Sequence, residues 1–134
     1  MNLTATGIKV IKADKLEPTA SSVDGIKRTP VFSLLSSQPE VTIGLAISPS
    51  GTKTGWHHHG PYEIAGYVVR GRSRFRWGAE GNESAELEPG DFFQVAPETI
   101  HAEETLGTED FEIVTARKGT QGMTVKLDGP EAAS

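Results

Sequence analysis

The chain has 134 residues, a formal net charge of −5 at pH 7 and no cysteine. This length allows one hydrophobic core, so we expect a single domain over residues 1–134. The negative charge disfavours nucleic acid and anionic membranes as partners, because both require a cationic face, and the lack of cysteine excludes disulfides and thiolate metal sites.

The first forty residues contain few signals of regular structure. Residues 7–12 alternate imperfectly between apolar and charged side chains and predict a short edge strand. Residues 13–30 contain Pro18, Gly25 and Pro30 and predict a covering segment with little regular structure, whereas residues 31–36 predict another strand. The N-terminus has neither a basic stretch nor a long apolar run, so we expect no signal peptide and a cytoplasmic location.

Strand and turn signals then alternate at short intervals. Residues 41–48 place aliphatic side chains at every second position, which is the pattern of a half-buried strand. Further strands are predicted at residues 64–70, 73–77, 83–88, 91–95, 100–105, 110–117 and 123–127. We expect 83–88 and 123–127 at sheet edges, 91–95 in the interior and a tail over 128–134. Short strands between glycine and proline turns predict an all-β sandwich or barrel.

Three of the four histidines are consecutive, His57, His58 and His59, and they stand between Gly55 and Gly60. The glycines disfavour a helix of useful length, so an extended segment is expected. In an extended chain, successive side chains point to opposite faces. His57 and His59 therefore share one face, and His58 lies on the other.

The fourth histidine, His101, stands in a later predicted strand. Imidazoles of His57, His59 and His101 with the carboxylate of Glu63 would form a ligand set suited to one divalent iron, manganese, nickel, zinc or copper ion. The alternative is a solvated histidine-rich loop that binds no metal.

The spacing of these residues resembles the two motifs of the cupins. The first motif is matched by Gly51, His57, His59, Glu63 and Gly71, and the second by Gly90 and His101. The resemblance covers about residues 41–117. It departs from the family pattern in two places, since seven residues instead of six separate Glu63 from Gly71, and Thr105 replaces the usual asparagine of the second motif.

The resemblance implies a small jelly-roll barrel, or double-stranded β-helix, with the metal site in its interior. It implies a metal-dependent enzyme acting on a small organic molecule, and a dioxygenase-type oxidoreductase is our leading hypothesis. A cupin isomerase or lyase, or a non-catalytic small-ligand-binding module, is the alternative, because one fold carries many functions. Small cupins of one barrel are commonly dimers, so a homodimer is expected.

Two further groups of charged residues each have two interpretations. Arg70, Arg72, Arg74 and Arg76 recur at every second position, which indicates a solvated outer face, with an anion-binding rim as the alternative. Glu103 would share a face with His101 in a regular strand. It could orient a ligand histidine or be solvated, and the solvated position is the one we expect.

Overall fold

The computed structural model describes residues 7–20, 24–31, 41–118 and 124–131. Their regular structure is almost entirely β, as predicted from the sequence. The strands are β1 (Thr19–Ala20), β2 (Lys27–Pro30), β3 (Val41–Ser48), β4 (Trp56–His58), β5 (Ile64–Arg70), β6 (Arg72–Trp77), β7 (Glu83–Leu87), β8 (Phe92–Val95), β9 (His101–Leu106), β10 (Phe111–Lys118) and β11 (Val125–Leu127). Two short 3₁₀ turns, η1 (Ala13–Lys15) and η2 (Ala79–Gly81), accompany them. No helix of these described ranges is long and apolar enough to cross a membrane.

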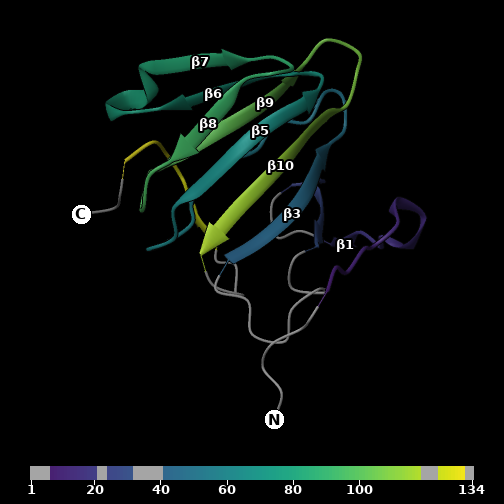
Figure 1. Cartoon of the computed structure of the whole chain (residues 1–134). Coiled ribbons are helices and arrows are strands. Elements are labelled where there is room, and N and C mark those ends of the chain that lie inside the picture. The colour runs from purple at the N-terminus through teal and green to yellow at the C-terminus, as the bar shows by residue number, and fades with distance from the viewer. Residues whose placement is uncertain (1–6, 21–23, 32–40, 119–123, 132–134) are drawn as a thin grey trace.

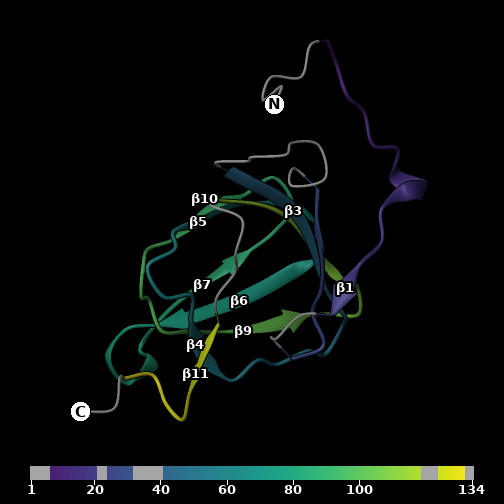
Figure 2. The same cartoon turned by 90° about the horizontal axis from the view of Figure 1, so that it is seen from below.

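The strands form two antiparallel sheets that face each other. One sheet has the order β1-β2-β3-β10-β5-β8, and the other has the order β11-β4-β9-β6-β7. From β3 to β6 the chain changes sheet at every strand, as in a jelly roll. The view along the barrel shows β3, β10 and β5 as one wall and β4, β9 and β6 as the opposite wall (Figures 1 and 2).

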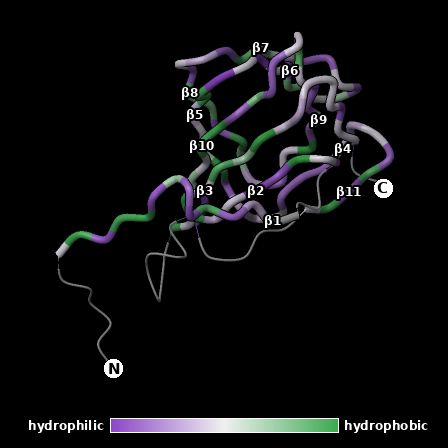
Figure 3. The backbone as a smooth tube through the Cα atoms, turned by 90° about the vertical axis from the view of Figure 1, so that its right-hand side faces the viewer, coloured by the Kyte–Doolittle hydropathy of each residue, from purple (hydrophilic) through white to green (hydrophobic). Residues whose placement is uncertain are grey.

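The barrel interior is built by alternation along each strand. Buried and more accessible positions alternate along β3, β5 and the first half of β10, and hydrophobic stretches recur along both sheets (Figure 3). Phe111 and Val68, among the most deeply buried side chains, pack with Phe75 from the opposite sheet. Since alternate side chains of facing sheets meet in the interior, this packing holds β6 against β5 and β10.

The passage from β5 to β6 is made possible by Gly71. Its φ is +78°, a left-handed conformation that favours glycine, and a Cβ there would overlap the backbone of Asp110. The glycine of the predicted first motif therefore has a steric role, because it lets the chain cross between sheets directly beside the start of β10.

Three predictions about the strands need correction. Residues 7–12 form no strand, and Ile8 and Val10 are exposed, because no strand of the described residues pairs with this segment. β2 lies in the segment predicted to be irregular; its sequence has weak strand propensity, and its pairing with β3 stabilises it. β8 is an edge strand with Phe92 81% exposed, so it is not an interior strand. The strand predicted at 31–36 falls largely outside the described residues.

Candidate metal centre

Three histidines meet inside the barrel. His57, His59 and His101 are 2%, 6% and 3% exposed, and one ring nitrogen from each lies within 4.8 Å of the others. The centre forms where β4 pairs with β9, because His57 and His101 are directly opposed across that antiparallel pair. His59 follows β4 on the same face as His57.

His58 points away from this centre. It is only partly buried, and its Nδ1 accepts a hydrogen bond of 2.9 Å from the backbone N–H of Gly60. The alternation of an extended chain therefore separates the histidines as the sequence predicts.

Hydrogen bonds at Nδ1 set the tautomer of two of the histidines. The Nδ1–H of His57 donates to the carbonyl oxygen of Gly55 at 2.9 Å, and the Nδ1–H of His101 donates to that of Thr99 at 2.9 Å. Because a carbonyl can only accept, each neutral ring keeps its lone pair on Nε2. This is the arrangement that proteins use to present Nε2 to a metal ion.

The His57 Nε2 atom is buried and has no hydrogen-bond partner among the described residues. A buried nitrogen lone pair without a partner is costly, since it has lost water and gained nothing in return. A divalent transition metal would satisfy it, and three imidazoles without thiolates suit the ions named above. The described residues therefore fit a metal centre.

Glu63 is not brought to the three histidines. It is exposed, and it immediately precedes Ile64, whose side chain is buried in the barrel. A turn closed by the Tyr62 N–H and the His59 carbonyl, 3.3 Å apart, delivers the chain to β5 in this register. Alternation then directs Glu63 away from the interior, because its neighbour Ile64 points inward.

Glu103 occupies the neighbourhood of the histidines instead. Its Oε2 lies 3.6 Å from His57 Nε2 and 3.7 Å from His101 Nε2, and its side chain is 14% exposed. The prediction of a solvated Glu103 is therefore wrong. Burial opposes ionisation of this carboxyl, but His101 and His57 in their protonated form outweigh it and hold its pKa well below the usual range. The sequence contains one sign of this placement, because Glu103 stands two residues after His101 and both side chains therefore share one face of a regular strand.

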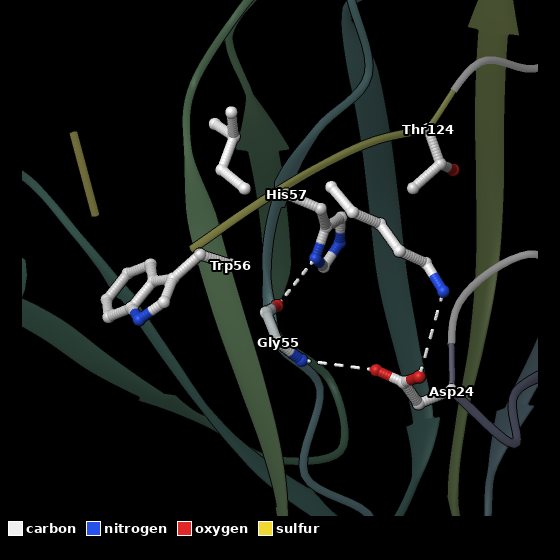
Figure 4. Close-up of a pocket in the computed structure, with 7 residues that line it drawn as sticks. Asp24, Gly55, Trp56, His57 and Thr124 are labelled. Atoms are coloured by element: carbon white, nitrogen blue, oxygen red, sulfur yellow. Dashed lines mark hydrogen bonds and ion pairs between the residues drawn. The ribbon is translucent and has the colours of Figure 1, made fainter. Parts of the chain in front are cut away.

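The backbone beside His57 is held by residues far away in the chain (Figure 4). The Gly55 N–H donates to Asp24 Oδ2 at 3.2 Å, while Asp24 Oδ1 lies 3.9 Å from the Lys126 ammonium of β11. The Gly55 carbonyl accepts from His57, so the loop before β2 and the strand β11 both support this ligand.

A largely apolar cavity opens beside the centre. Its volume is about 430 Å³, and its lining includes Phe75, Trp77, Phe93 and His101 together with the acidic Glu86 and Asp91. The strands β6, β7 and β8 provide most of this wall, on the far side of β9 from β4. A small, largely apolar molecule could therefore reach His101 from this side.

Two arginines of the six-stranded sheet face the interior. Arg28 is opposite Ala46, and Arg117 is opposite Thr42, and both of these partners on β3 are buried. Burial lowers the pKa of Arg28. The negative charge of Glu103 raises this pKa, and the positive charge of Arg117 lowers it further. Burial also lowers the pKa of Arg117. Guanidinium groups remain charged at neutral pH even so, which gives this side of the barrel a cationic character.

The arginines on β6 lie outside the barrel. Arg74 donates to Glu86 on the neighbouring strand at 2.7 Å, and Arg76 lies 5.2 Å from the ring centroid of Trp56. Arg72 is exposed as well. This is the solvated outer face expected for an alternating strand, with Phe75 and Trp77 on the inner face.

Comparison with known proteins agrees with this fold. A family model described as a cupin domain matches residues 44–117, more than half of the chain. The chain belongs to the cupin family. The uncharacterised protein MJ1618 of Methanocaldococcus jannaschii is 28% identical over 109 residues, which span 80% of this cupin and 85% of that protein.

Solved structures share the architecture at low sequence identity. KdgF from a Halomonas species has a TM-score of 0.65 and 21% identity, with 84% of this cupin and 96% of that chain covered. The polyketide cyclase RemF from Streptomyces resistomycificus has a TM-score of 0.75 and 12% identity, with coverages of 92% and 89%. At such identities the likeness establishes the double-stranded β-helix fold, and function is argued from the site.

Proposed function

We propose that this cupin is a metal-dependent enzyme acting on a small organic molecule, with one divalent transition metal held by His57, His59 and His101. The observation that carries the proposal is the buried Nε2 of His57, which has no hydrogen-bond partner among the described residues although its ring is fixed through Nδ1. An ion at this centre would supply a Lewis acid or a dioxygen-binding site at positions that the protein leaves open.

The chain's own residues would prepare the site for that chemistry. The Gly55 and Thr99 carbonyls keep the His57 and His101 rings in the tautomer that presents Nε2. The barrel walls keep all three rings nearly free of solvent. The aromatic cavity beside His101 would hold the body of the substrate against the centre.

The inward-facing arginines favour a substrate with a negative charge. Arg28 and Arg117 lie on the inward face of the six-stranded sheet, and a carboxylate is the ligand that matches a guanidinium in charge and shape. A small carboxylic acid with an apolar or aromatic body would suit both sides of the interior, and this is the substrate class that we expect.

The leading reaction class is dioxygenase-type oxidation, and an oxygen-dependence experiment tests it. The protein loaded separately with iron(II), manganese(II), nickel(II), zinc(II) or copper(II) is incubated with a panel of such acids, in air and under argon. We expect oxygen uptake matched to product formation, and none for His101→Ala. Product formation under argon would instead identify an isomerase or lyase, and binding without turnover under either gas would identify a binding module.

A further inference from the structure

The carboxylate beside the histidines is not the one that the family motif supplies. Glu103 and His101 are inward-facing residues of β9, and the Glu103 Oε2 lies almost equally far from the Nε2 atoms of His57 and His101, at 3.6 and 3.7 Å. Both separations are longer than a good hydrogen bond, so the carboxylate is close to two ring nitrogens without bonding well to either.

These separations are slightly longer than those between neighbouring ligands of a single metal ion. Metal–nitrogen bonds are about 2.0–2.1 Å and metal–carboxylate bonds about 2.0–2.2 Å, so adjacent ligands of a four- to six-coordinate ion lie roughly 3.0–3.5 Å apart. Only small side-chain shifts from the observed distances would place Oε2 and both Nε2 atoms around one ion. The same ion would satisfy the orphaned His57 Nε2.

The geometry points to Glu103 as the carboxylate ligand that completes the His57, His59 and His101 centre, in place of Glu63. This inference rests on the proposed metal-dependent function, and it adds the identity of the fourth ligand. A carboxylate there lowers the net charge of the centre by one unit, which would tune the acidity of any water bound to the ion.

The surroundings explain how a carboxylate can stay at this position. The Glu103 side chain is only 14% exposed, and an isolated charge so far from solvent is costly. Arg28, on the facing wall, supplies an opposite charge to Glu103 within the same interior. Glu63 has the opposite placement, because it is exposed and lies in the turn before β5.

The test compares Glu103→Gln with Glu63→Gln as a matched control, because both changes remove one negative charge and keep the side-chain shape. Cobalt(II) affinity is measured by competition with a chelator, and the cobalt absorption spectrum reports the ligand set. We expect Glu103→Gln to lose at least about tenfold in affinity, since even partners outside the ligand shell contribute that much. Its spectrum should shift, and Glu63→Gln should behave like the parent protein in both measurements.

Copper(II) paramagnetic resonance gives a second readout that does not depend on turnover. Glu103→Gln should change the copper hyperfine pattern, and near-ultraviolet circular dichroism of the metal-free variant should show that the barrel is intact. An unchanged affinity and unchanged spectra for Glu103→Gln would overturn the inference, and so would losses confined to Glu63→Gln. Failure of the parent protein to bind cobalt or copper would instead refute the proposed metal-dependent function itself, and the ligand assignment with it.

Discussion

The direction of individual side chains decides which histidines can share an ion. His57 and His59 are buried on one face, whereas His58 is turned toward the Gly60 backbone. Because imidazole must present a lone pair to the ion, a histidine that points elsewhere contributes nothing to the ligand set. The three consecutive histidines are therefore not equivalent, although their local sequence looks uniform.

Alanine substitution at each histidine should separate these roles. We expect His57→Ala, His59→Ala and His101→Ala to lose bound metal, because each removes one of three ligands. His58→Ala should retain the stoichiometry of the parent protein and serves as the matched control. Metal content after dialysis, measured by mass spectrometry, checks this. Loss of metal from His58→Ala, with retention in His57→Ala, would contradict the alternation argument.

At the scale of elements, the ligand strand β4 depends on support from both ends of the chain. β4 has only three residues, pairs with β11 on one side and contacts β9 through a single pair on the other. The Asp24 carboxylate accepts a hydrogen bond from the Gly55 N–H directly before β4. So short a strand has few ladder bonds of its own, and these outside contacts keep His57 in place.

Removal of the Asp24 carboxylate should weaken the centre from a distance. A residue that hydrogen-bonds directly to a metal ligand typically contributes about 10–100-fold to metal affinity. We expect a smaller loss of affinity for Asp24→Ala, because Asp24 acts on His57 only through Gly55. Lys126→Ala is the control, since its ion pair with Asp24 spans 3.9 Å between largely exposed groups and contributes little. Calorimetric titration with zinc would measure both, and equal effects of the two changes would argue against a specific role for the Gly55 hydrogen bond.

Packing between β5 and β8 limits the apolar cavity. The inner face of β5 at Gly66 is covered by the ring of Phe93, and a Cβ on Gly66 would overlap that ring. Phe93 also lines the cavity beside His101. The size of this glycine therefore helps to determine the shape of the substrate space.

Gly66→Ala should destabilise the barrel by about 1–3 kcal/mol, the usual cost of overpacking a core. Gly55→Ala is the matched control, because a Cβ there would meet no atom within 4 Å. Urea unfolding of the metal-free proteins measures the free energy of unfolding for both. Equal stability of the two variants would show that Phe93 can move aside without cost.

For the whole molecule, the outer face of the six-stranded sheet bears on assembly. Its outward side chains include Val41 and Ile43 of β3, Tyr67 and Val69 of β5, and Phe92 of β8, which are 38–81% exposed; β10 lies between β3 and β5. The edge strand β7, by contrast, carries Glu83 and Glu86, and charges of this kind protect an edge from pairing. If two copies associate, the apolar sheet face is the more favourable surface.

We expect a homodimer formed through this face. Multi-angle light scattering at micromolar concentration should give twice the 14.3 kDa mass of the chain. Val69→Glu combined with Phe92→Glu should shift the mass toward one copy, because a carboxylate buried between two apolar sheets has no partner. Ser84→Glu on exposed β7 is the control and should remain dimeric. A single-copy mass for the parent protein would refute the prediction.

Local sequence patterns determined the β architecture and much of the strand list. The alternation at 41–48 and the apolar run at 64–70 coincide with β3 and β5, because each strand has a face that must be buried. The same alternation placed His57 and His59 together and His58 apart. The motif spacing indicated the cupin family, since the glycine turns that it requires, such as Gly71, are written directly in the sequence.

Only the tertiary structure decided which carboxylate approaches the histidines. Glu63 is near them in sequence, but the turn after His59 and the inward register of Ile64 turn it toward solvent. Glu103 comes close because β9 pairs with β4 at His101, which no local pattern reveals. The strand β2, with inward-facing Arg28, likewise exists because β3 offers it a partner. Side-chain direction within a strand is a local property, whereas proximity between strands depends on pairing over long sequence separations, and only the assembled barrel determines that pairing.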